Sequence, residues 1–585
     1  MIKKEARLTA GLFFYISLRR PTFQVIMKKA LLALLCTILT ITAKGQVVNG
    51  ICYYKLDDSH VSVVVDQEWD SQSSTMIRHD YKGQLSIPPS VVIDNKTYTV
   101  TRVDLYGCPE LTGVSLPNTL EEIAEAGFSD CSSLTRVTLP SSLKKIGRFA
   151  FQSCDNLQEL TIPASVQEIG MNAFCTFSDN FKKLTITDLA AWCNIEMEGI
   201  VLTDGTVYLN DKPLTDLVIP EGVKTIKPYV FCGFKGITSV HIPACVDSIG
   251  YNAFMGCTSI TKVSADDIAS WCGIHFGPTT ILNTGNPLNL SNPVFYSENL
   301  YIGGSSITEL TIPEGVDSIG SCAFINLKSL TKVSLPSTLK YVGPNAFQDC
   351  VNLMIADVTS IRDYCGIEFA SLDSNPFQDY IRYRAFTWLL VNGNYVHEGN
   401  RVLSIPDGIT EIKANAFANA DPTETVIIPA SVTKIGTNAF RNSVTNRFHT
   451  LCIKGHIEDM GELAFGSCPF INTIYMEDLN PSAIPANTFT NYYIPPTNQT
   501  LGADYNYKHT KLMVPAGTKS IYESTDGWNL FENIEEYDVA AVNGIGLSNA
   551  ATTEFTLDGR PAGPDYKGII LVRMPDGTVR KELRK

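Results

Sequence analysis

The sequence predicts a mostly β solenoid, and three observations support this fold class. A pattern of apolar residues, proline, glycine and phenylalanine returns every 23 residues through the middle of the 585-residue chain. The prolines also repeat at 93 residues, from Pro220 to Pro313 and from Pro313 to Pro406. One such repeat cannot bury its own apolar edge, whereas stacked repeats bury a continuous core.

Each 23-residue coil is expected to begin with a short strand. In the coil LTRVTLPSSLKKIGRFAFQSC, from Leu134 to Cys154, apolar residues alternate until Pro140, which closes the strand because proline cannot donate to a β ladder. The V-x-x-I-G step predicts a second inward-pointing stretch, followed by Gly147 in a turn of positive φ. The remaining residues have room for one helical turn with Phe151 inside. We therefore expect two short strands and one helical turn per coil, with coils about 4.8 Å apart.

Irregular stretches interrupt the regular coils, and each carries a related sequence. The three copies read DLAAWCNIEM from Asp188, DIASWCGIHF from Asp267 and SIRDYCGIEF from Ser360. Because 93 is four times 23 plus one, these stretches are expected to form about two further coils rather than inserted domains. A ligand-binding aromatic cage is the alternative for Trp192, Trp271 and Tyr364, but their recurrence favours packing in the core.

The repeat L-x-x-[VL]-x-[IL]-P-x-x-[VL]-x-x-I-G-x-x-A-F-x-x-C resembles the BspA-type leucine-rich repeat of bacterial surface proteins. The resemblance covers about residues 83–536, and the W-C-x-I-x-F sequences also occur in such proteins. It implies an extracellular leucine-rich repeat solenoid. Members of that family are viewed as adhesion or host-interaction proteins, and they offer no shared catalytic residue to carry over.

The amino-terminal part of the chain is predicted to contain two regions. Residues 1–46 are expected to be an export signal, because the sequence MKKALLALLCTILTITA from Met27 has a basic start, an apolar middle and small residues at its end. Met27 is expected to be the true start. Residues 47–103 read as several strands and are predicted to form an N-terminal β cap, since a solenoid needs its first apolar edge covered.

The rest of the chain is predicted to comprise the solenoid and a small carboxy-terminal segment. The solenoid is expected over residues 104–538, with a last strand at residues 511–515 and with Trp528 and Phe531 closing the core. Residues 539–585 alternate like three strands. Their sequence FTLDGR…KGIILVRMPDGTVRKELRK resembles the C-terminal sorting domains of type IX secretion cargo in the Bacteroidetes, and a plain β cap is the alternative.

Sixteen cysteines in an exported protein would ordinarily suggest disulfides. Six of them instead fall three residues after the repeated phenylalanine or its equivalent Leu105, namely Cys108, Cys131, Cys154, Cys257, Cys350 and Cys468. Other coils carry Phe or Leu in this position, so we expect buried thiols there. Cys257, Cys350 and Cys468 are predicted to be unpaired. Disulfides among the consecutive Cys108, Cys131 and Cys154 remain open, because a spacing near 4.8 Å lies inside disulfide range.

Composition and charge exclude several classes of protein. Hydrophobic residues make up 44% and charged residues 18%, which excludes wholesale disorder. Lys and Arg total 46 against 60 Asp and Glu, and removal of residues 1–46, with eight basic residues and one Glu, leaves 38 against 59. An acidic chain without a basic stripe is a poor nucleic-acid binder. The sequence has no run of 18 apolar residues, so no transmembrane helix is predicted.

The sequence carries no motif for catalysis or cofactor binding. It contains no H-E-x-x-H, G-x-S-x-G, Walker or dinucleotide-binding pattern. Cys272-x-x-His275 has the spacing of a metal-ligand pair, but the matching position of the next copy is Glu368, so no metal site is predicted. We expect neither a cofactor nor enzymatic activity, and a hydrolase is the least favoured alternative.

The preferred hypothesis is a non-catalytic, adhesin-like interaction protein, displayed at the cell surface or released. Its partner is expected to be a protein, such as one of the host surface or matrix, bound by the first-strand face of the repeats. The predicted contacts occupy positions that are not committed to the core: Arg136, Glu159, Asp216, His241, Lys262, Glu309 and Lys332. Glycan binding is the alternative. It is less favoured because the exposed strand positions read as threonines and charged residues, whereas sugar sites usually present Trp or Tyr.

Overall fold

The structure is a computed structural model. It describes residues 45–70, 75–174, 181–199, 206–278, 280–281, 287–288, 291–377, 387–396, 402–420, 424–442, 448–492, 501–539, 553–556, 568–573 and 579–584. The chain divides into two compact units, residues 1–213 and 214–585. The predicted export signal lies outside the described residues except for its last two.

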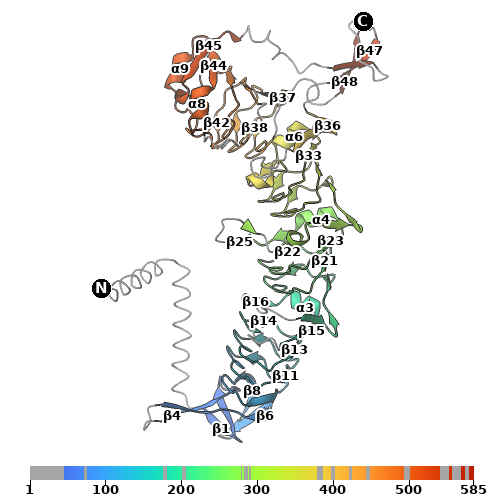
Figure 1. The fold of residues 1–585 in the computed structure, drawn as a ribbon, viewed down its shortest axis with the longest axis vertical. Helices are drawn as coiled ribbons and strands as arrows, with labels where there is room; N and C mark the ends of the chain where they lie inside the picture. Colours follow the sequence, from blue (N-terminus) through green and yellow to red (C-terminus); the bar gives the residue numbers. More distant parts are fainter. Residues whose placement is uncertain are drawn as a thin grey trace, which may run out of the picture. The chain divides into compact units, whose positions relative to one another are not determined.

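The first unit begins with the strands expected before the repeats, together with four strands that sequence reasoning did not identify. They are β1 (Gln46–Val48), β2 (Ile51–Lys55), β3 (His60–Val64), β4 (Asp66–Asp70), β5 (Thr75–His79), β6 (Gly83–Ser86), β7 (Ser90–Ile93) and β8 (Lys96–Asp104). Strands β3 and β8 pair in parallel. Strand β8 then pairs with β10 (Glu122–Ile123), which belongs to the first coil. The amino-terminal strands therefore continue directly into the stack of coils (Figure 1).

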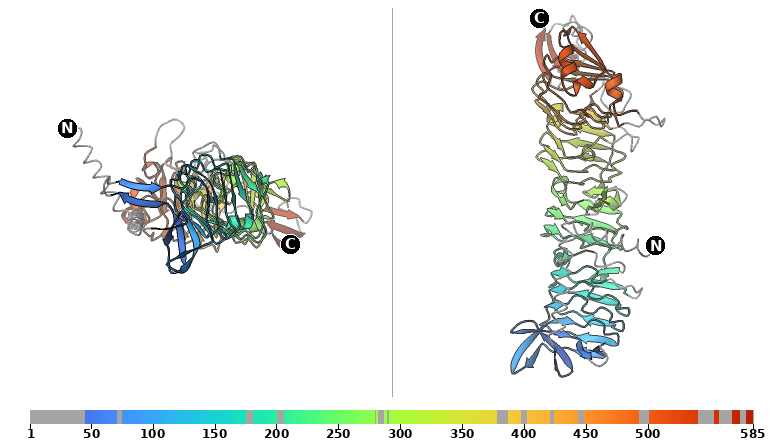
Figure 2. Two further views of the ribbon diagram at one scale, coloured as in Figure 1. Left: turned by 90° about the horizontal axis from the view of Figure 1, so that it is seen from below. Right: turned by 90° about the vertical axis from the view of Figure 1, so that its left-hand side faces the viewer.

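Each regular coil contributes two short strands, as predicted. We call the strand before the repeated proline the first strand and the strand before the repeated glycine the second strand. A strand of an irregular stretch takes the name of the strand with which it pairs in parallel. Second strands of successive coils pair in parallel at the 23-residue spacing, with Ile123 beside Ile146 and Ile146 beside Ile169. Figure 2 shows the resulting ladder of coils.

The remaining strands of the first unit follow this scheme. First strands are β9 (Leu111–Ser115), β11 (Arg136–Thr138), β13 (Glu159–Ile162), β15 (Lys183–Ile186) and β17 (Thr206–Leu209), which turns back into β18 (Lys212–Pro213). Second strands after β10 are β12 (Lys145–Ile146), β14 (Glu168–Ile169) and β16 (Glu196–Met197).

The third part of each coil differs from the predicted helical turn. Phe149 and Ser153 both have positive φ, at 55° and 56°, so the segment is a succession of tight turns. The physical reason is the direction of the hydrogen bonds. The amides of Phe149 and Phe151 donate to the carbonyls of Met171 and Ala173 in the next coil instead of to carbonyls of their own coil.

Gly147 also differs from the prediction, because its φ is not positive. A Cβ atom at this position would lie 2.4 Å from the Glu125 amide nitrogen and 2.5 Å from the Ala124 carbonyl oxygen. The same holds for Gly170, Gly250 and Gly343, each of which meets the backbone of the preceding coil. Glycine is needed here for the close approach of two coils, not for backbone freedom.

The core of the solenoid contains stacks of phenylalanine rings from successive coils. Phe128 and Phe151 stack at 5.4 Å, and Phe440 and Phe465 at 5.2 Å between ring centroids. The cysteines three residues further on are buried, and their thiols donate to the preceding coil: Cys154 to the Phe128 carbonyl at 3.0 Å and Cys350 to that of Phe324 at 3.0 Å. All fourteen cysteines within the described residues are free thiols.

The three W-C sequences form short helices whose aromatic side chains are buried in the core. The helices are α3 (Leu189–Cys193), α4 (Ile268–Gly273) and α6 (Ile361–Cys365), capped by Asp188, Asp267 and Ser360. Trp192, Trp271 and Tyr364 are at most 1% exposed. The Trp271 indole donates to the Ala323 carbonyl at 2.9 Å, which ties the helix to the next coil. Core packing, rather than an aromatic cage, is therefore confirmed.

The second unit contains two modules of similar sequence, which we call module A (residues 214–306) and module B (residues 307–396). Module A comprises β19 (Asp216–Val218), β20 (Thr225–Ile226), β21 (Ser239–Ile242), β22 (Ser248–Ile249), β23 (Lys262–Ala265), β24 (His275–Phe276), β25 (Thr280–Ile281), β26 (Pro287–Leu288), α5 (Val294–Ser297), β27 (Leu300–Ile302) and β28 (Ser305–Ser306). Module B comprises β29 (Glu309–Thr311), β30 (Ser318–Ile319), β31 (Lys332–Leu335), β32 (Tyr341–Val342), β33 (Ile355–Val358), β34 (Glu368–Phe369), η1 (Leu372–Ser374), β35 (Trp388–Val391) and β36 (Asn394–Tyr395).

The last coils contain one strand more than predicted. Their elements are β37 (Val402–Ser404), β38 (Glu411–Ile412), β39 (Thr425–Ile428), β40 (Lys434–Ile435), β41 (Thr450–Ile453), β42 (Asp459–Met460), β43 (Thr473–Met476), α8 (Tyr505–His509), β44 (Lys511–Pro515), α9 (Lys519–Ser524), η2 (Trp528–Leu530) and β45 (Asn533–Tyr537). Strand β45 pairs with β44, so residues 511–515 are not the last strand. Trp528 and Phe531 are buried against Phe489 and close the stack of rings, as expected.

The three strands expected in the carboxy-terminal segment are present. Strands β46 (Thr553–Thr556), β47 (Gly568–Arg573) and β48 (Val579–Arg584) form one antiparallel sheet.

Candidate partner-binding face

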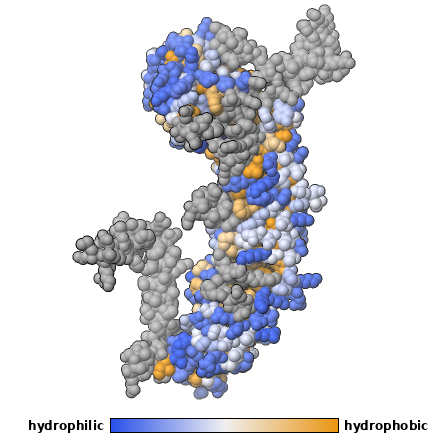
Figure 3. Space-filling view, viewed as in Figure 1, coloured by the Kyte–Doolittle hydropathy of each residue, from blue (hydrophilic) through white to orange (hydrophobic). Residues whose placement is uncertain are grey.

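The first strands of the repeats present the surface on which sequence reasoning placed a partner. Along each strand, side chains alternate between the core and solvent. In β11, Val137 is buried while Arg136 and Thr138 are exposed, and β13 and β29 follow the same pattern. We call the outward side of these strands the first-strand face. Hydrophilic side chains predominate on the part of the molecule seen in Figure 3, with small apolar patches between them.

All seven predicted contact residues lie on the first-strand face, but not in one sheet. Arg136, Glu159, Asp216, Lys262 and Glu309 are exposed, and His241 and Lys332 are half-buried. The β6–β9–β11 sheet carries Arg136, and the sheet from β13 to β18 carries Glu159. The sheet from β19 to β28 brings together Asp216, His241 and Lys262, and the sheet from β29 to β36 brings together Glu309 and Lys332.

Rows of aligned side chains on this face are interrupted where one sheet ends and the next begins. Strand β27 turns back into the antiparallel strand β28, and β35 turns back into β36. Each hairpin occupies the edge where the next parallel strand would have paired. Gly303 and Gly304 allow the first of these turns, with φ of 56° and 84°. Rows of aligned side chains consequently run only within one sheet.

In module A, His241 is held by two polar neighbours. Its Nδ1 lies 3.0 Å from the Ser264 hydroxyl oxygen and its Nε2 lies 3.3 Å from Asp266 Oδ1. Asp266 also accepts a hydrogen bond from the Ala244 amide at 2.8 Å. In the adjacent row, the Ser239 hydroxyl donates to Asp216 at 2.5 Å. This patch offers fixed hydrogen-bonding groups on a rigid sheet.

Sequence reasoning missed the tyrosines that lie on the same face. The Lys262 ammonium lies 5.2 Å from the Tyr301 ring centroid, and Lys183 lies 4.8 Å from that of Tyr208. Tyr208 and Tyr301 are 93 residues apart, so the longer sequence period could have revealed them. Trp388 stands on the same face in module B. The expectation that this face lacks Trp and Tyr is wrong, because the hairpin strands were not recognised as part of it.

In module B, Lys332 is engaged with a neighbouring strand. Its ammonium lies 3.0 Å from Asp357 Oδ2, and Asp357 Oδ1 accepts the Gly393 amide at 2.9 Å. The two side chains are only 27% and 14% exposed. The Glu309 backbone pairs with Lys332 of β31, but among the described residues its carboxylate has no hydrogen bond or ion pair. Glu309 therefore contributes the unneutralised charge of this sheet.

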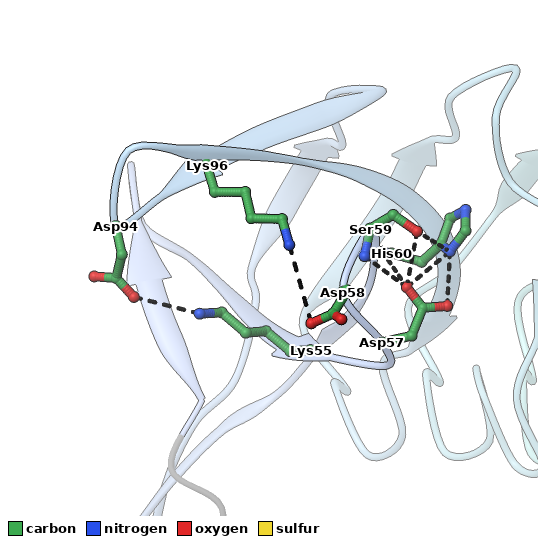
Figure 4. A network of polar contacts seen from close by, with 7 residues as sticks. All are labelled: Lys55, Asp57, Asp58, Ser59, His60, Asp94 and Lys96. Carbon is green, nitrogen blue, oxygen red and sulfur yellow. Dashed lines mark hydrogen bonds and ion pairs between the residues drawn. The ribbon is translucent and has the colours of Figure 1, made fainter.

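A second polar cluster lies at the turns of the amino-terminal strands (Figure 4). Asp57 accepts hydrogen bonds from the amides of Ser59 and His60, at 2.7 and 2.8 Å, and its Oδ2 lies 2.8 Å from His60 Nδ1. These contacts, led by that with the His60 side chain, lower the pKa of the Asp57 carboxyl. Lys55 pairs with Asp94 at 3.3 Å. The contacts hold two exposed turns together, and sequence reasoning did not identify them.

The residues weighed for metal binding and nucleophilic chemistry are not brought together. Cys272 is buried, whereas His275 on β24 is exposed. Within the described ranges, no group of three or more His, Cys, Asp or Glu side chains is arranged to hold a metal ion. Burial raises the pKa of the Cys257, Cys272 and Cys350 thiols to about 12. These thiols are neutral at physiological pH and are poor nucleophiles.

The coils define the class of this protein as a leucine-rich repeat solenoid. The sequence matches the family described as BspA type leucine rich repeat region, in six copies over residues 87–193, 205–273, 296–387 and 396–513. These segments cover more than half of the chain, so the protein belongs to the BspA-type leucine-rich repeat family. In the part of the chain that the structure describes, no helix is long and apolar enough to cross a membrane.

Solved structures similar to this chain come from several bacteria. A leucine-rich repeat protein from Bacteroides ovatus has 18% identity and a TM-score of 0.39, over 77% of this chain and 100% of its own. A leucine rich cell surface protein from Faecalibacterium prausnitzii has 21% identity and a TM-score of 0.29, over 71% and 94%. The pneumococcal vaccine antigen PcpA has 17% identity and a TM-score of 0.30, over 85% and 100%. A search of curated proteins gave no significant match.

Proposed function

We propose that this protein is a non-catalytic interaction protein that binds a protein partner through its first-strand face. The observation that carries the proposal is the alternation of buried and outward positions within each first strand. The buried positions are apolar in coil after coil, whereas the outward positions carry different charges on the same rigid backbone. Such a surface can change its contacts without changing the fold, which is how repeat proteins build binding surfaces.

The proposal includes export and display. The basic and apolar sequence from Met27 supports secretion, and the β segment at residues 553–584 supports a sorting role at the cell surface. An adhesin that meets host surface or matrix proteins would use both features. Removal of residues 542–585 should then leave the coils folded but reduce the amount of protein at the surface. Full surface yield of the truncated protein would exclude a sorting role for this segment.

Binding is tested first on arrays of matrix proteins and glycans probed with the purified chain. A protein ligand is then measured against a variant in which Arg136, Glu159, Lys262 and Glu309 are all changed to Ser. These four side chains are exposed, and no ion pair within the described residues involves them, so the fold should persist. The net charge also stays the same. We expect binding to fall at least about tenfold.

A matched control removes four exposed charges beside the second strands of modules A and B. Lys224, Asp247, Asp317 and Lys340 lie at or just before the second strands, and they again comprise two bases and two acids. Changing all four to Ser should leave binding intact. Equal losses for the two variants would mean that the first-strand face is not the binding surface. Binding to glycans alone would favour the alternative function.

A further inference from the structure

Among the surface positions at which modules A and B differ, four are neighbours on the first-strand face. In module A these positions are polar: Thr261, Lys262, Asn299 and Ser306. In module B they are Met354, Ile355, Trp388 and Tyr395. The register fixes the correspondence, because β23 pairs with β27 as β33 pairs with β35, and Ser306 faces Tyr301 as Tyr395 faces Leu390.

The four residues of module B are neighbours on adjacent strands, and we call them the apolar cluster. Ile355 pairs with Trp388, the Trp388 amide donates to the Met354 carbonyl at 2.7 Å, and Tyr395 lies on the next strand. Met354 is 50% and Tyr395 is 40% exposed, and Ile355 and Trp388 are half-buried. The Trp388 and Tyr395 rings meet edge to face at 6.1 Å. In module A, Ser306 and Asn299 make a hydrogen bond of 3.4 Å at the same place in the hairpin. Because a polar pair holds the same hairpin, the fold does not require this apolar surface.

The polar groups beside the cluster favour a protein ligand over a sugar. A sugar stacked on Trp388 would need free hydrogen-bonding groups next to the ring. The Lys332 ammonium and both Asp357 oxygens are already engaged with each other and with the Gly393 amide. Two apolar side chains at the start of the neighbouring strand, Met354 and Ile355, complete the cluster instead. A half-buried Trp with exposed Tyr and Met beside a polar rim matches the composition of protein-binding hot spots.

The charge on the same row indicates what the partner carries. Glu309, Lys332, Ile355 and Trp388 stand in register across four adjacent strands. Lys332 is neutralised by Asp357, so Glu309 supplies the free charge of the row. Three strand spacings put it about 14 Å from Trp388. An extended peptide covers about that distance in four residues.

We propose that the module B cluster of Met354, Ile355, Trp388 and Tyr395 anchors a protein segment that presents an apolar side chain and, about four residues away, a basic side chain to Glu309. This inference rests on the proposed function and names the chemistry of the partner. The apolar anchor supplies most of the affinity, and Glu309 selects basic over acidic segments.

The test uses the purified full-length protein and an array of synthetic twelve-residue peptides. Each peptide has one Phe and one Lys, four residues apart, in a background of Ser, Thr and Gly. Matched peptides carry Glu in place of Lys, or Ser in place of Phe. We expect binding of the Phe/Lys peptides and at least about tenfold weaker binding of both matched series. Equal binding of Lys and Glu peptides, or no binding at millimolar peptide, overturns the proposal.

The decisive variant combines Met354→Thr, Ile355→Ser, Trp388→Asn and Tyr395→Ser. Three of these changes install the residue of module A, and serine at 355 keeps the net charge unchanged. The melting temperature should stay close to that of the parent protein, while peptide binding falls at least about tenfold. Tyr301→Ser, which removes a ring from the same face of module A, is the control and should bind as the parent does. Undiminished binding by the four-residue variant overturns the proposal.

Comparison with the four-charge variant separates this inference from the proposed function. A matrix protein could bind the parent chain and the apolar-cluster variant but fail to bind the four-charge variant. The first-strand face would then be the binding surface, and the apolar anchor would be wrong. If neither variant affects binding, both proposals fail. If the apolar-cluster variant loses only glycans on the array, the site binds carbohydrate and the protein assignment is overturned.

Discussion

Modules A and B share the repeated phenylalanine and glycine of their coils and differ on the outward side of their first strands. Phe254 and Phe347 are 93 residues apart and are both fully buried. Gly250 and Gly343 meet the preceding coil in the same way. On the first-strand face, by contrast, Lys262 of module A corresponds to Ile355 of module B. The comparison teaches that the fold constrains the inner half of each coil and leaves the outer half open to selection for binding.

The largest expected effect tests the shared core. Phe254→Ala and Phe347→Ala each remove one ring from a stack, at 5.3 Å from Phe231 and 5.5 Å from Phe324. Each change should destabilise the protein by about 3–5 kcal/mol, because it removes buried apolar surface and leaves a cavity. Thermal unfolding followed by circular dichroism measures the loss. A clear difference between the two variants would show that the modules are not equivalent in their cores.

A smaller loss is expected from the glycines at the contact between coils. A Cβ atom on Gly250 would lie 2.4 Å from the Pro228 nitrogen, and one on Gly343 would lie 2.6 Å from the Ser321 nitrogen. Alanine at either position should cost about 1–3 kcal/mol, since two backbones must move apart. The first coil of module A carries Lys227 at the equivalent position, so Lys227→Ala should be close to neutral in the same melting experiment. If the glycine-to-alanine variants melt like the parent protein, close approach of two coils does not explain why glycine occurs here.

A third prediction sharpens the contrast between the exposed positions. Lys332 is paired with Asp357 at 3.0 Å, whereas Lys262 only approaches the Tyr301 ring. Lys332→Ala should cost about 0.5–1 kcal/mol, reduced by added salt, because the pair is partly shielded from solvent. Lys262→Ala should leave the melting temperature nearly unchanged. The reverse order of the two effects would contradict the register described above.

The smallest expected effect concerns two buried cysteines, which should not react with an alkylating reagent while the protein is folded. Cys257 and Cys350 are free thiols that donate to carbonyls of the preceding coil, at 3.1 and 3.0 Å. Burial raises the pKa of both to about 12, so they stay protonated and unreactive at pH 8 while the protein is folded. After denaturation without reductant, an alkylating reagent should modify both, as mapped by mass spectrometry. A peptide carrying either cysteine in a disulfide would contradict this.

The sequence predicted what repeats, but not why each repeated residue is needed. Phe151 and Ile146 were assigned to the core correctly, because burial depends on a period that can be read along one chain. The role predicted for Gly147 is wrong, because a Cβ atom at this position would clash with Ala124 of the preceding coil. The cysteines were predicted to be buried, but their hydrogen bonds to carbonyls were missed for the same reason. The sequence period shows which positions repeat, but not which atoms of neighbouring coils come into contact.

The candidate site was the harder part to predict. All seven proposed contact residues lie on the expected face, because alternation along a strand fixes which side chains point outward. The hairpins were not foreseen. They break the face into separate sheets and bring Tyr301 and Trp388 onto it. Their strands follow irregular stretches whose spacing departs from 23 residues, so no template position marked them.

The hairpins also have a consequence for how such a chain can change its length. Strands β28 and β36 end their sheets, so each module carries its own boundary with it. A duplication or deletion of 93 residues would join one such boundary to another like it and leave every pairing intact. A gain of a single 23-residue coil would have to be accommodated inside a sheet that is already closed. The natural unit of growth for this protein is therefore the module, and its reach can be adjusted in whole modules without redesigning a single contact.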